Sequence, residues 1–291
     1  MARRVHVLGY TWREGQPCLR ILEEDQRSNL PLVGDIDWLV TPERRCIGRR
    51  EEGVPRSCPT GDVPRGSGHC ERCQWADGFR VCMICTGFNC PSLPPAMHEK
   101  CQSQHVLYLA SFGDDRVKVG TAVWHRRDGR LHDQGPLAAL RVASAEGPVI
   151  KQMEHVLVKA GFTEAFRRED KRRLLASATS PQDALAGLHA EARRLPELLS
   201  SSYHAALGIE IVPLPDLAIR TRDRYAARDL LDASPGCRRT GSIVGAVGHL
   251  LAVEDEAGVF YLDLAGLKAR VIDLAPSSRE GRRSRVQLSL F

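Results

Sequence analysis

Hydrophobic and polar positions alternate along residues 105–122, HVLYLASFGDDRVKVGTA, on both sides of a short Gly-Asp-Asp turn. This pattern is typical of two β-strands joined as a hairpin. Alternate residues of a strand point to one face, so Tyr108 shares a face with Ala110, and Lys118 shares one with Gly120. Further strands are expected at residues 5–12, 18–24, 38–40 and about 139–144.

A helical period follows the hairpin, and it predicts helices over about 124–132, 148–160 and 163–176. Pro148 suits the first helical position and Gly161 a position just after a helix end. Ser180 is the expected N-cap of a fourth helix, and Pro196 should kink or interrupt it. The apolar face of that helix comprises Leu185, Leu188, Ala192, Leu195 and Leu199.

The strand pattern returns after Gly208, in runs punctuated by glycine at 209–214, 240–255, 258–264 and 269–274. These runs predict a small antiparallel module, with the option that the N-terminal strands pair with it. The expected parts are residues 1–45 (β-strands), 46–104 (cysteine-rich), 105–200 (a central domain), 208–275 (the C-terminal β module) and 276–291 (a basic tail). The fold class is therefore α+β.

Composition narrows the class of protein. The 291-residue chain is 43% hydrophobic and carries a net charge of +5, with arginine far exceeding lysine. No run approaches the roughly 20 apolar residues of a membrane span, and the N-terminus lacks the apolar stretch of a signal peptide. A cytoplasmic protein without a membrane partner is expected.

Cysteines are concentrated in the segment 46–104, which is rich in glycine, proline and arginine. In a cytosolic protein, two Cys-x-x-Cys pairs in such a segment indicate zinc rather than disulfides. Eight cysteines allow two structural zinc sites. The preferred sets are Cys46, Cys58, Cys70 and Cys73, then Cys82, Cys85, Cys90 and Cys101.

Other ligand sets remain open. A single ion held by Cys70, Cys73, Cys82 and Cys85 is the simpler rival. His98 or His105 could replace a cysteine, whereas Cys18 and Cys237 are isolated and expected to be buried thiols.

The hairpin, the stretch GRLHDQGP at 129–136 and the Gly-rich run at 241–253 together resemble the bacterial DUF2797 family of zinc-binding proteins. The central segment also resembles the GIY-YIG nuclease superfamily, with Val106-Leu107-Tyr108 and Lys118-Val119-Gly120 at the two triplets. The resemblance implies a GIY-YIG-like small mixed sheet flanked by helices.

The resemblance also implies roles for particular residues. Tyr108 would help activate water, Lys118 stands at the second tyrosine position, Arg130 would stabilise the phosphate and Glu154 would hold one Mg²⁺ or Mn²⁺ ion. Close to this set, anion or substrate binding is expected from Gly120, Arg127, His132, Asp133 and Gln134. The basic helix would add phosphate contacts from Arg167, Arg168, Lys171, Arg172 and Arg173.

Three functions follow as hypotheses. The first is metal-dependent phosphodiester cleavage or processing of nucleic acid. The second is a non-catalytic, zinc-stabilised module that binds nucleic acid or protein. The third is a biosynthetic enzyme that uses the same pocket for a small anionic substrate. A shared fold cannot decide among them.

Overall fold

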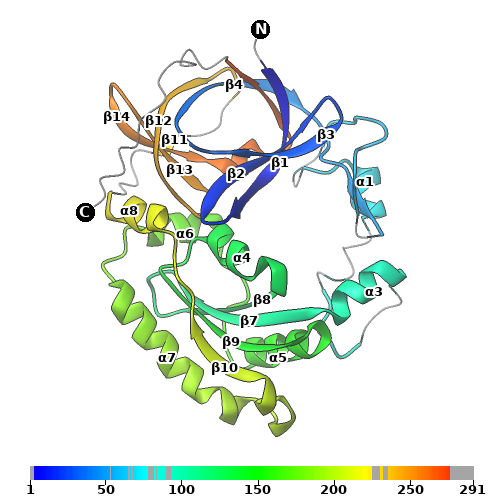
Figure 1. Ribbon diagram of the computed structural model, residues 1–291, viewed down its shortest axis with the longest axis vertical. Helices are drawn as coiled ribbons and strands as arrows, with labels where there is room; N and C mark the ends of the chain where they lie inside the picture. Colours follow the sequence, from blue (N-terminus) through cyan, green and yellow to red (C-terminus); the bar gives the residue numbers. More distant parts are fainter. Residues whose placement is uncertain are drawn as a thin grey trace, which may run out of the picture.

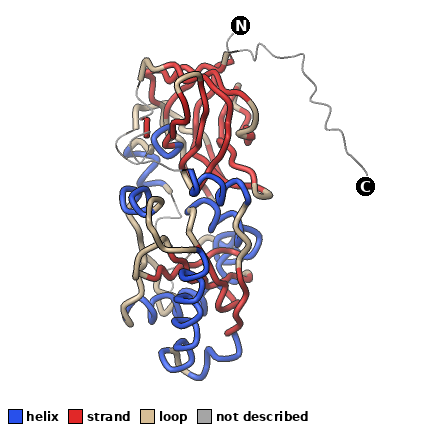
Figure 2. Tube along the Cα trace, turned by 90° about the vertical axis from the view of Figure 1, so that its left-hand side faces the viewer, coloured by secondary structure: helices blue, strands red, loops and turns tan. Residues whose placement is uncertain are grey.

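The computed structural model describes residues 3–52, 54–64, 66, 68–77, 82, 84–89, 93–224, 230, 231 and 235–275. This part of the chain confirms the α+β class, with two large sheets and a two-stranded ribbon (Figure 1). One end of the molecule is rich in strands, whereas helices surround the sheet at the other end (Figure 2).

The strand-rich end, called here the terminal module, is a curved nine-stranded sheet in the order β11-β14-β13-β12-β4-β15-β1-β2-β3. Its strands come from both ends of the chain, since β15 pairs with β1 and β4. The strands are β1 (Arg3–Arg13), β2 (Gln16–Glu23), β3 (Gln26–Pro31), β4 (Asp35–Arg44), β11 (Leu230–Leu231), β12 (Arg238–Val247), β13 (Leu250–Asp255), β14 (Gly258–Asp263) and β15 (Arg270–Leu274).

An apolar core holds the terminal module together. Val7, Leu19, Ile21, Leu251 and Ile272 are almost inaccessible to solvent and come from strands far apart in the sequence. Burying such side chains contributes roughly 1.5–3 kcal/mol each. The polar strand β3 escaped the sequence analysis because it lies at the sheet edge and contributes little to the core.

The central domain contains a four-stranded sheet in the order β10-β9-β7-β8. All its strand pairs are antiparallel, so the expected mixed sheet was wrong; the parallel pairing is limited to an isolated bridge between Lys118 and Thr163. The strands are β7 (Gln104–Ser111), β8 (Val117–Val123), β9 (Ala138–Glu146) and β10 (Leu207–Ile211).

Strand alternation divides this sheet into two faces. Leu107, Leu109 and Val119 belong to a core with α5 and α7, whereas Tyr108 and Ala110 pack on the opposite side with α4. The second face looks toward the terminal module (Figure 1). The helices here are α4 (Arg127–Gln134), α5 (Gly147–Lys159), α6 (Arg168–Leu174) and α7 (Pro181–Leu198), with 3-10 turns η1 (Trp124–Arg126) and η2 (Ser201–Ala206).

The remaining elements connect the two larger parts. The cysteine-rich segment forms the ribbon β5 (Arg49–Glu51) and β6 (Val54–Arg56), then α1 (Glu71–Ala76) and α3 (Pro95–Gln102). Helix α8 (Asp216–Arg224), which the sequence analysis missed, packs on β12, and the turn η4 (Leu264–Leu267) precedes β15.

Three expectations need correction. The run at 209–214 does not join the terminal module, because β10 pairs with β9 and Glu210 forms an ion pair with Arg141. The boundary at 200–208 was therefore misplaced. The helix expected over 163–176 starts only at Arg168, because the backbone of Thr163 pairs beside β8.

The expected interruption at Pro196 also needs correction. Pro196 lies inside α7, but it does not interrupt the helix, which continues to Leu198. Proline removes a single backbone donor, and the position is only two residues from the helix end, so few hydrogen bonds depend on it. The N-cap expected at Ser180 is confirmed, since its hydroxyl oxygen accepts from the Asp183 amide at 3.0 Å.

Candidate functional site

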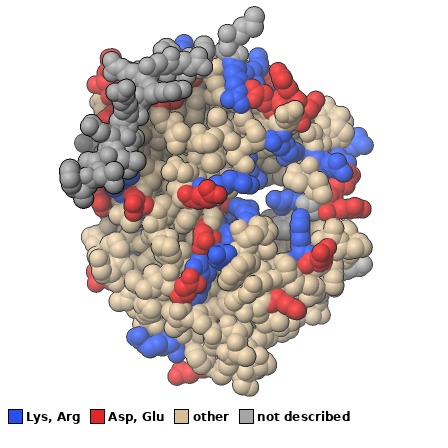
Figure 3. Space-filling view, viewed as in Figure 1, with Lys and Arg blue, Asp and Glu red and all other residues tan. Residues whose placement is uncertain are grey.

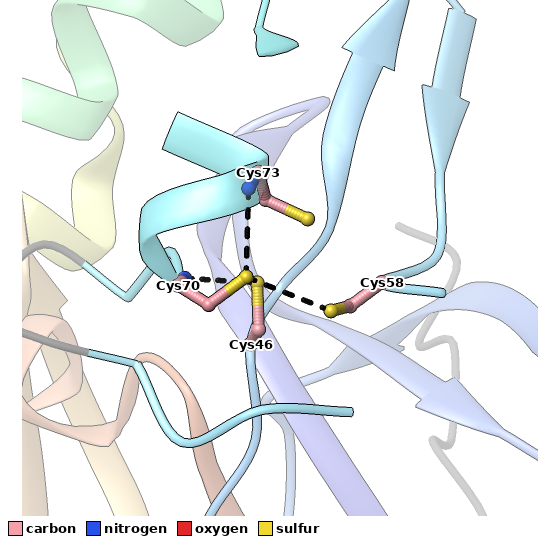
Figure 4. Close-up of side chains that lie close together, drawn as sticks. All are labelled: Cys46, Cys58, Cys70 and Cys73. Carbon is pink, nitrogen blue, oxygen red and sulfur yellow. Dashed lines mark hydrogen bonds between the residues drawn. The ribbon is translucent and has the colours of Figure 1, made fainter. Parts of the chain in front are cut away.

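Four cysteine thiols converge between the β5–β6 ribbon and α1 (Figure 4). The sulfur atoms of Cys46, Cys58, Cys70 and Cys73 all lie within 4.8 Å of one another. Cys58 Sγ and Cys70 Sγ are 3.8 Å apart, which matches the edge of about 3.8 Å in a tetrahedron with Zn–S bonds of about 2.3 Å. This donor set fits a metal ion such as zinc.

The local backbone positions the cysteine sulfur atoms of this cluster. Cys70 is the N-cap of α1, and its sulfur accepts from the Cys73 amide at 3.4 Å. The sulfur of Cys46 accepts from the amides of Gly48 and Cys70 at 3.4 and 3.1 Å. Gly48 has φ +86°, and a Cβ there would lie 1.9 Å from the Arg56 carbonyl oxygen. Glycine therefore permits the tight turn that brings Cys46 beside Cys70.

The first expected ligand set is thus brought together, while its single-ion rival is not formed. Among the described residues, the potential ligand groups include neither Cys82, Cys85 nor Cys101, and Cys90 lies outside the described residues.

The histidines and isolated cysteines have other environments. His98 contacts Gln102, and His105 hydrogen-bonds with the Ser103 carbonyl, so neither belongs to the cysteine cluster. Cys18 is buried as expected, but Cys237 is only half-buried because it lies in the exposed approach to β12.

The hairpin residues predicted to form the site meet on the face of the central sheet that looks toward the terminal module. Tyr108 is 1% exposed and lies directly opposite Gly120 on β8. A Cβ at Gly120 would lie 2.4 Å from Tyr108 Oη. The space beside Gly120 is therefore filled by the tyrosine rather than left for a ligand, which corrects its expected anion-binding role.

Gly120→Ala is expected to lower the free energy of unfolding by about 1–3 kcal/mol, because the added methyl overpacks the Tyr108 ring. Chemical denaturation measures this change. Gly187→Ala is the matched control: nothing lies within 4 Å of a Cβ at this helical position, and alanine there should stabilise the helix by up to about 1 kcal/mol. Equal stability of wild type and Gly120→Ala would contradict the tight Tyr108 contact.

Tyr108 lies close to other candidate residues, which belong to α4 and α5. Gln134 Nε2 donates to Tyr108 Oη at 2.5 Å. Burial raises the pKa of Tyr108, while Arg130 and Gln134 oppose that shift. The tyrosine hydroxyl is thus kept neutral and oriented near Arg130.

Lys118 and Glu154 are both buried near this tyrosine. Lys118 is 7% exposed, and its ammonium donates to the backbone carbonyl of Glu164. Glu154 is 8% exposed and forms an ion pair with Lys151 at 2.5 Å. The charges of Arg130 and Glu154 both act on the pKa of Lys118, after the larger effect of burial. The predicted residues therefore lie in one electrostatic neighbourhood.

A cavity of about 450 Å³, called here the basic cavity, opens beside this neighbourhood at the junction with the terminal module. Figure 3 shows an opening between the two halves of the molecule that is bordered by lysine and arginine side chains. The cationic residues that line the cavity are Arg20, Arg50, Lys118, Arg126, Arg130, Arg168 and Lys171, against the acidic Asp133 and Glu164. This charge balance favours an anion.

Two other predicted anion-binding residues, Gln134 and Asp133, line the basic cavity but have different partners. Gln134 lines the basic cavity and also accepts from Lys171 at 3.4 Å. Asp133 lines it too, but its carboxylate accepts from the Trp12 amide and pairs with Arg126, both at 2.8 Å. Asp133 is thus a structural link to β1.

Two residues expected at the anion site lie elsewhere. Arg127 stacks on the Trp124 ring at 4.3 Å, and His132 packs against Trp12. Neither lines the basic cavity. His132 is two positions from Arg130 and therefore points to another face of α4. Arg127, at the start of the helix, is held instead by the carbonyl and the ring of Trp124.

The basic residues of α6 and its N-cap also fall into two groups, those that line the basic cavity and those that do not. Arg168 and Lys171 line the basic cavity, whereas Arg167 does not. Arg172 and Arg173 form ion pairs with Glu169 and Asp170 on the helix itself. One face of the helix therefore serves the cavity, and the other carries paired surface charges.

Sequence reasoning missed Arg20, Arg50 and Arg126 as cavity residues. They come from β2, β5 and η1, which are far apart along the chain. No motif or spacing links them, because only the packing of the terminal module against α4 brings them together.

Two lysines of the cavity titrate near neutral pH. Burial is the main cause that lowers the pKa of Lys171 to about 7, and Lys118 and Arg130 lower it further. Burial, followed by Arg130, lowers the pKa of Lys118 to about 8. Each lysine is therefore a potential proton acceptor near neutral pH as well as a cation.

Sulfate binding is expected to weaken as the pH rises from about 6 to 9, because both lysines lose their protons across this range while sulfate keeps its charge. In the same window the unfolded chain binds more protons than the folded chain, so the unfolding free energy without ligand should rise with pH. Calorimetric titration and thermal unfolding measure the two trends. Lys171→Met should flatten both, and pH-independent sulfate binding would contradict this assignment.

Comparisons with models of known families, curated proteins and solved structures found no match to this chain. None of the described helices combines the length and the apolar character needed to cross a membrane.

Proposed function

We propose that the central domain carries out phosphodiester cleavage or processing of nucleic acid in the basic cavity. The observation that carries this proposal is the convergence of Lys118, Arg130 and Lys171 on one cavity, beside Tyr108 and the buried Glu154. Fixed cations in a partly desolvated site stabilise the charge that develops on a transferring phosphoryl group. The resemblance of the hairpin to the GIY-YIG nucleases supports the same proposal.

Glu154 is the residue that would hold a catalytic Mg²⁺ or Mn²⁺ ion. Magnesium is commonly bound through one or two carboxylates together with waters and substrate phosphates, so a single buried carboxylate fits an ion that binds with the substrate. Lys151 now pairs with that carboxylate at 2.5 Å and would have to move aside. Such an ion supplies Lewis acidity at a phosphate oxygen.

The side chains in the cavity and the buried Tyr108 beside it would have different tasks. Arg130 would bind and orient the phosphate, since guanidinium groups match phosphate geometry. Tyr108 is too deeply buried to ionise readily, so it would act as a neutral hydrogen-bonding group oriented by Gln134. Lys171, with a pKa of about 7, is in part unprotonated near neutral pH, and in that neutral form it is suited to accept a proton from the attacking water.

We also propose that Cys46, Cys58, Cys70 and Cys73 hold one structural zinc ion. Four protein ligands leave no position open for substrate, which is typical of structural rather than catalytic zinc. The ion would stabilise the turn that follows β4 and leads into the β5–β6 ribbon, and this ribbon places Arg50 at the basic cavity. Zinc therefore supports the site indirectly.

A small anionic substrate is the second candidate, and the size of the cavity favours it. A volume of about 450 Å³ lies within the usual range for small-molecule sites of roughly 300–1,000 Å³. A single nucleotide unit of a longer strand would fit the same space.

The test is cleavage of labelled single- and double-stranded DNA and RNA by the wild type, with Mg²⁺, with Mn²⁺ and with chelator. Lys151→Met serves as the companion variant. It should lower the metal concentration that gives half-maximal cleavage, because it frees the Glu154 carboxylate from its ammonium partner. Cleavage that persists unchanged in chelator, or that occurs on none of the four substrates, would refute the proposal. Turnover of a small phosphate ester alone would favour the second candidate.

A further inference from the structure

A second cavity, of about 690 Å³, adjoins the basic cavity. It lies between the β1–β2 turn and the start of α4, and Trp12, Arg13, Asn29 and His125 are among its lining residues. Arg20 and Arg126 line both cavities. The two cavities therefore meet at this arginine pair, one residue from the terminal module and one from the central domain.

The backbone of β1 is shaped around Arg20. Pairing between β1 and β2 shifts by one residue between Val7 and Gly9, and Gly9 has φ +145°. A Cβ at Gly9 would lie 2.7 Å from Arg20 Nη2. The extra residue lies in β1, so the bulge bends β1 at the point where it faces Arg20 of β2. Glycine thus gives the guanidinium its place against the β1 backbone.

Arg20 is not engaged in a structural ion pair. Within the described part of the chain, its guanidinium makes no hydrogen bond or ion pair, although the side chain is accessible to solvent. Arg126, in contrast, is oriented by Asp133 at 2.8 Å, and Asp133 is itself held by the Trp12 amide. One free and one oriented arginine face the boundary between the cavities.

The nearby acidic groups do not neutralise this pair. Glu14 lies at the β1–β2 turn, and Asp128 is engaged in an ion pair with Arg141. Asp133 contributes one negative charge against the two arginines, and in the second cavity Glu14 offsets the charge of Arg13. An anionic ligand would therefore find positive potential on both sides of the boundary.

We propose that Arg20 and Arg126 form a second phosphate subsite, through which a single-stranded nucleic acid passes from the basic cavity into the second cavity. This inference rests on the proposed function, which places the reacting phosphate at Lys118, Arg130 and Lys171. Both cavities have the volume of nucleotide units, so they suit a single strand better than a rigid duplex. The terminal module would then be part of the substrate site.

The experiment compares two probes in buffer without divalent metal, so that no cleavage occurs. One is a fluorescein-labelled 12-nucleotide single strand, followed by anisotropy, and the other is adenosine 5′-monophosphate, followed by calorimetry. Arg20→Gln and Arg126→Gln should each weaken strand binding about tenfold, as expected for loss of a charged hydrogen bond. The salt slope should fall by about 0.7 for each variant. The affinity for the monophosphate should fall less than the affinity for the strand, because Arg20 and Arg126 line the basic cavity only at its boundary with the second cavity.

Arg193→Gln, at an exposed position of α7 remote from both cavities, is the charge-matched control and should bind both probes like the wild type. Wild-type strand affinity in both subsite variants, or absence of strand binding by the wild type, would overturn the inference. An equal loss for both probes would also overturn it, since Arg20 would then serve the basic cavity alone. Cleavage assays separate the two proposals. If the variants bind the strand like the wild type and the wild type cleaves nucleic acid, only the subsite is refuted. If the variants lose strand binding as predicted but the wild type cleaves nothing, only the nuclease function is refuted.

Discussion

Cys73→Ser is expected to abolish tight zinc binding and to unfold the turn that joins the cysteine-rich segment to β4. Cys73 is fully buried at the start of α1, and its sulfur lies within 4.8 Å of the three other thiols. Zinc binding contributes about 10–16 kcal/mol in zinc-finger peptides, so losing one of four ligands removes a large part of the stabilisation of this segment. Zinc content by mass spectrometry should fall by one ion per chain.

Thermal unfolding and proteolysis of the cysteine-rich segment provide the structural measurement. Cys73→Ser and chelator-treated wild type should behave alike, with a lower melting temperature and early cleavage within residues 46–104. Cys237→Ser is the matched control, because Cys237 is outside the cluster and only half-buried. The same zinc content in Cys73→Ser and in the wild type would contradict the four-cysteine site.

Glu154→Gln is expected to lower the cleavage rate by about 10²–10³-fold, the scale seen when one electrostatic contribution to a transition state is removed. Glutamine keeps the shape of the buried side chain but cannot provide the negative charge that a divalent ion requires. The loss of the Lys151 ion pair should cost little, since Lys151 remains about one quarter exposed and can be solvated. Single-turnover cleavage at saturating metal measures the effect.

Glu197→Gln, at an exposed position of α7, removes the same charge away from the site and should cleave at the wild-type rate. Zinc content and melting temperature should match in all three proteins. A wild-type rate in Glu154→Gln would show that this carboxylate holds no catalytic metal, and the non-catalytic binding module would then be the better hypothesis for the central domain.

Local sequence signals were sufficient where neighbouring residues decide the structure. The alternation correctly placed Tyr108 and Ala110 on one face of their strand, and these two residues lie opposite Gly120 and Lys118 of the partner strand. Pro148 and Gly161 correctly bracketed α5, and Ser180 correctly marked the start of α7. These features depend on strand period, proline geometry and capping, all of which act within a few residues.

Errors arose where a distant partner determined the outcome. The strand at 209–214 was assigned to the terminal module, yet Arg141 and the β9 backbone bind it in the central sheet. The basic run after Thr163 has strong helical character, but its first residues pair beside β8 instead. In both cases tertiary pairing outweighed local propensity.

The cysteine spacing was enough to select one preferred ligand set, Cys46, Cys58, Cys70 and Cys73. Zinc ligation by thiolates depends on residue type and on the spacing of the ligands along the chain. The basic cavity is different. Its arginines come from β2, β5 and η1, and each alone is an ordinary surface residue. They become a site only because the two ends of the chain close into one sheet that packs against α4, and electrostatic potential depends on distance in space rather than along the sequence.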